Sequence, residues 1–191
     1  MRYAPSMGFQ RNYSPAPRGF SIIELMITVL IAAILTALAL PNLVQFLRRM
    51  QVSQVKNDII ADVNFAKAEA AKRGYPVGIY ALSGSNNWST GWAVWADTNG
   101  DGSITAADTM LRQHDGLNNG YALITSGPNS NLAPLLFNAQ GAVQLPVTVP
   151  VYFVACNPDK VPANARTVQV GGSGAVLGVN GIPGASGVSC P

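Results

Sequence analysis

The chain is poor in the residues from which most catalytic and metal sites are built. It has one histidine and two cysteines in 191 residues, and charged residues make up 11% of its composition. A zinc site takes four ligands, mostly Cys and His, so this set is too small for one. The Gly-x-Ser-x-Gly pattern of many hydrolases is absent, and His114 has only nonspecific carboxylates nearby. We therefore expect a protein that is not an enzyme, with His114 exposed on a strand.

Charge is also nearly absent from residues 20–40, an apolar run whose single charged residue is Glu24. At about 1.5 Å per helical residue the run is roughly 31 Å long, which matches a bilayer core of about 30 Å. The segment is therefore expected to span a membrane. A carboxylate inside such a segment is costly and needs a partner, for which an amine is the natural candidate.

The leader before this run carries Arg2, Arg11 and Arg18 and no acidic residue, so it holds all of the formal net charge of +3. A basic leader stays in the cytoplasm by the positive-inside tendency, and the C-terminal part is sent outward. The sequence pI near 9.0 therefore says little about nucleic-acid binding.

The stretch RGFSIIELMITVLIAAILTALALP resembles the N-terminus of type IV pilins and of type II secretion pseudopilins. The resemblance implies that a prepilin peptidase cuts between Gly19 and Phe20 and that the new terminus is N-methylated. It also implies that Glu24 pairs with the terminal amine of a neighbouring subunit during filament assembly. Two unit charges 4 Å apart at an effective dielectric of 20 interact by about 4 kcal/mol, enough to favour one register.

Two other interpretations account for less of this N-terminus. An ordinary secretory signal cut after Ala39 has an apolar region of about 7 to 15 residues and needs no Glu24. A plain membrane anchor explains the charge but not the adjacent Gly19 and Phe20. The pilin-like interpretation accounts for all of these features.

Helical periodicity continues beyond the apolar run, so we predict one helix over about residues 20–73. Lys72, Arg73 and Gly74 form a natural helix end, and Pro41 is expected to kink the helix where it leaves the bilayer. We place Asp62 off the apolar stripe, which consists of Leu43, Leu47, Met50, Val55, Ile59, Val63, Ala66 and Ala70.

After Tyr75 the composition changes to short β-type runs separated by turn residues. The predicted strands are 76–82, 91–96, 109–114, 121–125, 135–138, 142–145, 151–155, 166–170 and 175–179. The fold class is therefore α+β, a long membrane-spanning helix packed on an antiparallel β domain, as in pilins. The expected segments are a leader (1–19), a transmembrane half-helix (20–40), an outer half-helix (41–74) and a β domain (75–191).

The β part resembles the GspH/FimT/FimU branch of minor subunits, through GWAVWADTNGDG, then TMLR, FNAQG and ARTVQV in that order. Some FimT-like members that take part in DNA uptake carry a Gly-Arg-x-Arg segment, where this chain has Gly174, Ala175, Val176 and Leu177. Phosphate binding needs clustered cations, so DNA binding is not favoured. Arg166 is expected to be an exposed strand residue paired with a carboxylate.

The acidic loop 97–108 partly matches an EF-hand pattern, and its candidate calcium ligands are Asp97, Asn99, Asp101, Ser103 and Asp108. The last ligand is Asp instead of the usual Glu, and strands, not helices, flank the loop. Asp, Asn and Gly are also the residues of any tight turn. Calcium is therefore the one candidate cofactor, and a plain turn is the alternative that we favour.

Cys156 and Cys190, an even pair in an exported domain, are predicted to form a disulfide. Trp92 and Trp95 differ by three positions and should face opposite sides of their strand, with at least one in the core.

The resemblance implies a minor subunit of a type IV pilus or type II secretion pseudopilus, structural in filament initiation or assembly. The alternative is a binding module displayed on the filament for DNA, a surface or a secreted substrate. The implied partners are the prepilin peptidase and N-methyltransferase, other pilins or pseudopilins, and the bacterial inner membrane. The chain would cross that membrane once, with its C-terminal domain in the periplasm. Pilus and secretion system are not distinguished by these residues.

Overall fold

A computed structural model describes residues 19–126, 135–144, 150–184 and 189–191. Contacts divide the chain into two compact units, Met1–Leu43 and Val44–Pro191. In chain order the described elements are α1 (Ile22–Arg73), β1 (Val77–Ala81), β2 (Gly91–Ala96), β3 (Thr109–Asp115), β4 (Ala122–Ser126), β5 (Leu135–Phe137), β6 (Val143–Gln144), β7 (Val151–Cys156), the 3-10 helix η1 (Pro162–Asn164), β8 (Arg166–Val170) and β9 (Val176–Asn180). The predicted strands are all found, with ends within one residue wherever the structure describes them.

In the first unit, α1 exposes its apolar side chains all round. Phe20 is 80% exposed and Leu38 is 68% exposed, and the most apolar window of the helix buries nothing within the chain. By length and composition this helix can cross a membrane. Helical structure continues through Pro41, which lacks an N–H for the carbonyl of Ala37. The kink expected at Pro41 stays a prediction.

In the second unit, α1 becomes amphipathic. Its buried residues, spaced three or four apart except for the adjacent pair Asp62 and Val63, are Val52, Val55, Ile59, Asp62, Val63, Ala66 and Ala70. The apolar periodicity predicts Leu47 and Met50 on the stripe, but each is 54% exposed. The helix ends as predicted: Gly74 has a φ of 77°, and its N–H donates to the carbonyl of Ala70 at 2.9 Å.

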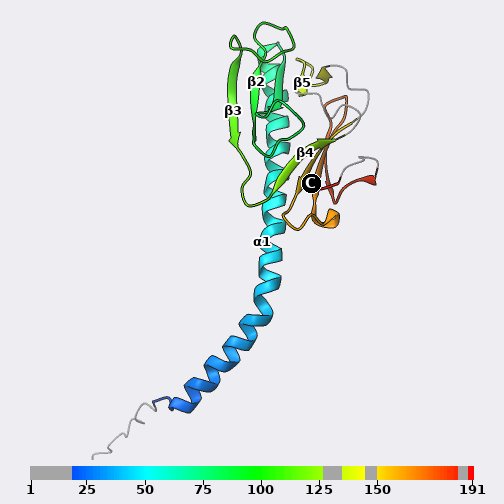
Figure 1. Cartoon of the computed structure of the whole chain (residues 1–191). Helices are drawn as coiled ribbons and strands as arrows, with labels where there is room; N and C mark the ends of the chain where they lie inside the picture. The colour runs from blue at the N-terminus through cyan, green and yellow to red at the C-terminus, as the bar shows by residue number, and fades with distance from the viewer. Residues whose placement is uncertain (1–18, 127–134, 145–149, 185–188) are drawn as a thin grey trace, which may run out of the picture. The chain divides into compact units, whose positions relative to one another are not determined.

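The strands form two antiparallel sheets beside this part of α1 (Figure 1). Sheet A has the order β3-β2-β1-β5-β6, and sheet B has the order β4-β7-β8-β9. One core cluster joins the buried helix face to the inner faces of both sheets, for example Ile59 with Trp92 of sheet A and Phe153 of sheet B. The sequence predicted the strands but not their division into two sheets.

Strand β7 is buried on both faces, although its sheet has only one face against the helix. Val151, Phe153 and Ala155 belong to the main core, and the alternate residues Tyr152 and Val154 belong to a second cluster. That cluster also includes Ile182 and the cystine of Cys156 and Cys190. Ile182 and the cystine therefore cover the outer face of β7.

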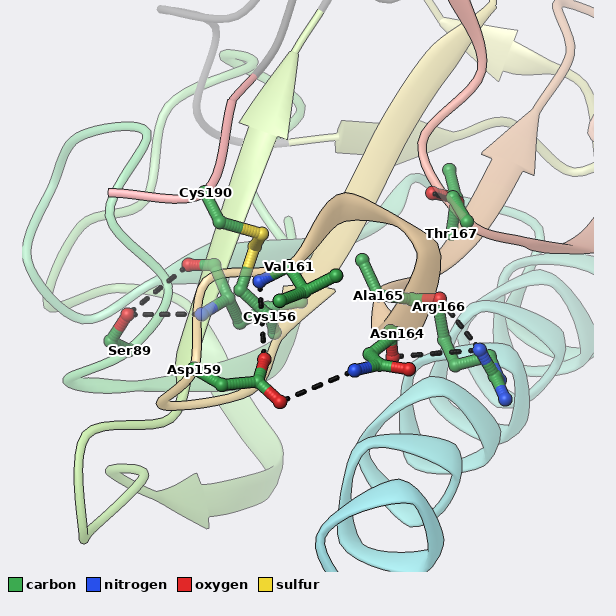
Figure 2. Close-up of a disulfide and its surroundings, with 11 residues drawn as sticks. Ser89, Cys156, Asp159, Val161, Asn164, Ala165, Arg166, Thr167 and Cys190 are labelled. Atoms are coloured by element: carbon green, nitrogen blue, oxygen red, sulfur yellow. Dashed lines mark hydrogen bonds between the residues drawn. A yellow bond between two sulfur atoms is a disulfide. The ribbon is translucent and has the colours of Figure 1, made fainter. Parts of the chain in front are cut away.

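The predicted disulfide is confirmed: Cys156 and Cys190 are bonded, with their Cα atoms 5.8 Å apart and a sequence separation of 34 (Figure 2). Among the described residues no carboxylate pairs with Arg166. Its Nη1 donates to the carbonyls of Asn164 at 3.5 Å and Ala165 at 2.8 Å. The expected surface ion pair was wrong because these carbonyls lie within reach of the side chain as the chain enters β8.

Two turns, one from each sheet, meet against the helix at Lys67. The Nζ of Lys67 donates to the carbonyl of Gly174 at 2.5 Å, and the N–H of Val143 donates to the carbonyl of Gly172 at 2.9 Å. A Cβ built on Gly174 would lie 2.0 Å from the carbonyl oxygen of Gly141. Position 174 is therefore closed to side chains, and this junction ties both sheets to α1.

Candidate functional site

The expected processing and assembly residues lie at the start of α1. Gly19 and Phe20 precede the helix without regular structure, and both are exposed. Glu24 lies in the first helical turn among exposed apolar neighbours. The arrangement is open to a protease before the helix and presents a carboxylate within its first turn.

Ser21 caps this helix, a feature that the sequence interpretation missed. Its Oγ accepts the N–H of Glu24 at 3.2 Å, and its carbonyl accepts the N–H of Leu25 at 3.2 Å. Ser21 and Glu24 thus have the Ser-x-x-Glu spacing of a capping box, visible in the sequence. A carboxylate in the first turn also interacts favourably with the helix dipole. Glu24 therefore has a local role at the helix start besides its expected role in assembly.

A second cluster is built around Asp62, which is fully buried at 0% exposure. Its Oδ2 accepts the indole N–H of Trp92 and lies beside Nε2 of His114, each at 2.8 Å. Its Oδ1 accepts from Nη1 of Arg112 at 2.8 Å. One carboxylate on the helix thus holds side chains from two neighbouring strands of sheet A.

Rings enclose this carboxylate. His114 stacks on Trp92 with ring centroids 4.8 Å apart and planes 9° apart, and the Arg112 guanidinium lies 4.2 Å from the Phe65 ring centroid. Burial raises the pKa of the neighbouring Asp58, with His114 opposing and Asp62 adding to the shift. A second carboxylate one helical turn away is therefore destabilised when ionised.

These contacts correct two predictions. His114 is half-buried and paired, not simply exposed on its strand, and Asp62 lies on the buried face of α1, not off it. Asp62 follows Ile59 by three positions and precedes Ala66 by four, so helical geometry places it among them. The prediction for the tryptophans is confirmed: Trp92 is 2% exposed in the core, whereas Trp95 is half-buried on the other face of β2.

The acidic loop uses its carboxylates to hold its own backbone. Asp97 is 2% exposed and accepts the N–H groups of Gly100 at 2.7 Å and Gly102 at 2.9 Å. Asp108 accepts those of Thr105 at 2.7 Å and Thr98 at 2.9 Å. The backbone hydrogen bond from Thr105, opposed by burial, lowers the pKa of Asp108.

The other candidate calcium ligands bond to one another. Asn99 Nδ2 donates to Oδ2 of Asp101, and the N–H of Ser103 donates to its Oδ1, each at 2.7 Å. Within the described part of the chain, no three or more His, Cys, Asp and Glu side chains gather as metal ligands. The geometry is that of a turn closed by its own hydrogen bonds, and calcium binding stays a prediction.

Comparison with known proteins identifies the family. The model of the family "Type II transport protein GspH" matches residues 56–174, more than half of the chain. The chain belongs to the GspH family. The model of the "Prokaryotic N-terminal methylation motif" matches residues 16–40, which include Gly19, Phe20 and Glu24. The GspH-family chain is therefore a pilin-like structural subunit and not an enzyme, as expected.

Solved structures share the fold of this chain. The type IV minor pilin FimU of Pseudomonas aeruginosa PAO1, in one crystal form, has a TM-score of 0.57 at 21% identity. The alignment covers 76% of this chain and 99% of that one. A second crystal form of FimU gives 0.54 at 21% identity, over 73% and 99% of the two chains. These likenesses confirm the pilin-like fold.

A curated relative, the type IV major pilin protein PilA of Myxococcus xanthus, is 45% identical over 50 residues. These 50 residues make up 26% of the chain described here. The chain thus spans about a quarter of that relative's length, 23%.

Proposed function

We propose that this chain is a minor subunit of a type IV pilus or of a type II secretion pseudopilus, with a structural role in initiating or assembling the filament. In this proposal a prepilin peptidase cuts between Gly19 and Phe20 and the new amino terminus is methylated. The basic leader keeps that terminus at the cytoplasmic side of the inner membrane, and the β domain lies in the periplasm.

The observation that carries the proposal is the setting of Glu24. It is the single charge in a run of exposed apolar residues, four positions after Phe20. Among the described residues no cation pairs with it. An unpaired carboxylate in a membrane segment is costly, so a partner from outside the chain is expected. The terminal amine of an adjacent subunit would supply the opposite charge at the depth where Glu24 lies.

The test compares Glu24→Gln with Glu24→Ala in cells that assemble the filament. Gln keeps the size and polarity of the side chain, so this variant isolates the charge, whereas Ala removes the whole side chain. In both variants the Ser21 Oγ can still accept the backbone N–H of residue 24. We expect both variants to be exported and cleaved but depleted from sheared filaments relative to membranes. Ser21→Ala, which weakens the cap by about 1 kcal/mol and keeps the charge, is the matched control and should still be incorporated.

Mass spectrometry of the wild-type protein from membranes should show an N-methylated Phe20 terminus. A terminus at Leu40 or an intact leader would refute the processing step. Wild-type incorporation of Glu24→Gln would refute the role of the charge. The genes encoded beside this one, for pilus assembly or for secretion, distinguish the two filament systems.

A further inference from the structure

A hollow of about 510 Å³ lies on the face of sheet A that is turned away from the helix. Its lining consists of Tyr80 of β1, Trp95 of β2, Gly84 and residues 102–106 of the acidic loop. Its volume falls within the range of about 300 to 1,000 Å³ that is usual for ligand sites. The proposed assembly role of the helix does not use this hollow.

Strand register explains why two aromatic rings stand here. Trp95 pairs with Gly78, and Tyr80 pairs with Ala93, so both large side chains rise from the sheet beside small neighbours. Their ring centroids are 5.8 Å apart at an interplanar angle of 65°. Burial raises the pKa of the Tyr80 phenol, which therefore stays neutral. The two rings thus form two walls of a partly dehydrated recess.

The segment 74–111, which supplies the lining of the hollow, carries charges of one sign only. No lysine or arginine occurs in residues 74–111, whereas Asp97, Asp101 and Asp108 all belong to the loop that roofs the hollow. The Asp97 carboxylate binds the N–H of Gly102, one of the lining residues, at 2.9 Å. The local field therefore repels anions and attracts cations.

We propose that this hollow is a docking site for a lysine or arginine side chain presented by a partner protein. The cation would lie over the faces of Tyr80 and Trp95, where ring quadrupoles attract it, and the carboxylates of the loop would add long-range attraction. A neutral apolar side chain would gain the ring contacts but nothing from the acidic rim. The assignment rests on the hollow alone and holds whether or not the chain enters a filament.

The indole N–H resonances of the full-length protein in maltoside micelles provide the test. Phosphocholine detergents are avoided because their own quaternary ammonium groups would compete for aromatic walls. Trp88 and Trp92 are internal references, since their buried N–H groups bond to Thr125 at 3.2 Å and to Asp62 at 2.8 Å. The remaining indole resonance, assigned by its loss in Trp95→Phe, reports on the hollow.

The probes are acetyl-Gly-Lys-Gly-amide, its arginine counterpart and the uncharged norleucine peptide. We expect the two cationic peptides to shift the Trp95 resonance saturably at millimolar concentration, and the norleucine peptide to bind about two- to fivefold more weakly. Added salt should weaken the cationic peptides more than the norleucine peptide. Tyr80→Leu and Asp101→Asn should each reduce cation binding, whereas Asp159→Asn, a carboxylate of another loop, should not.

Equal binding of the norleucine and lysine peptides would overturn the proposal. So would the absence of a saturable shift at Trp95, or binding that Tyr80→Leu and Asp101→Asn leave unchanged. Each result is independent of filament assembly, so failure here leaves the proposed function untouched. Conversely, a negative result for Glu24 says nothing about this hollow.

Discussion

Replacing Asp62 should be the most damaging single change to a charged residue of the β-bearing unit. Asp62→Ala leaves the buried indole N–H of Trp92 without its acceptor, which costs about 1 to 3 kcal/mol. Arg112 and His114 also lose their contacts with the Asp62 carboxylate. Their side chains are 40% and 30% exposed, so water replaces much of that interaction. We add about 0.5 kcal/mol for each of these two. The sum is about 3 kcal/mol.

Urea or thermal unfolding of the full chain, followed by tryptophan fluorescence, measures this loss. For a domain of this size it corresponds to a fall in Tm of roughly 6 to 12 °C. Asp62→Asn keeps one acceptor oxygen and should lose less. The matched control is Asp58→Asn, one helical turn earlier.

Substitution of Asp58 should change the free energy of unfolding in the opposite direction. Burial raises the pKa of Asp58 above its ordinary 3.8, so ionising it destabilises the folded state, and its contribution falls as pH rises through the folded pKa. Asp58→Asn removes that penalty and should be neutral or stabilising at pH 7. A loss below about 0.5 kcal/mol for Asp62→Ala, or an equal loss for Asp58→Asn, would refute the reasoning.

Three further predictions concern the β domain. Cys190→Ser should destabilise it by about 4 kcal/mol, the loop-closure value for a separation of 34 residues, and thiol labelling of freshly isolated, denatured protein should find no free thiol. Thermal melts with millimolar calcium and with chelator should differ little for wild type and for Asp101→Asn, since the loop satisfies its own backbone, and a rise of several degrees with calcium would establish the metal site. Gly174→Ala should cost at least about 2 kcal/mol in urea unfolding, because its φ is +75° and the new Cβ would meet a carbonyl oxygen at 2.0 Å. Gly184→Ala, which has no atom within 4 Å of the new Cβ, is the control and should be near neutral.

Local patterns predicted most of this fold from sequence. The apolar period of about 3.6 residues predicted the helix, and Gly74 predicted its end. Turn residues predicted where the strands end. The pilin-like N-terminus was visible because its signal is contiguous. The disulfide could be predicted because the chain has two cysteines, which leaves one possible pairing within it.

The Asp62 cluster was missed because its parts are far apart in sequence. Trp92 and Arg112 lie 30 and 50 positions from Asp62, and only the register of β2 with β3 brings them together. A charged residue at a helical core position is ordinarily taken as a solvent-facing one unless its partners are known. The burial of β7 on both faces was not predicted either. A strand that is buried on both faces shows no alternation of apolar and polar residues in its sequence.

The junction at Lys67 has a mechanical consequence. Asp62 is hydrogen-bonded to sheet A. Lys67, about 7.5 Å further along the same helix, is hydrogen-bonded to the turn of Gly174 in sheet B. A pull along the axis of this part of α1 would therefore load both sheets at once, through side-chain bonds placed in shear. The turns of the two sheets are also bonded to each other, from the N–H of Val143 to the carbonyl of Gly172, so load on one sheet is shared with the other. Under tension this unit should yield in one event, and Lys67→Met should split that event into two.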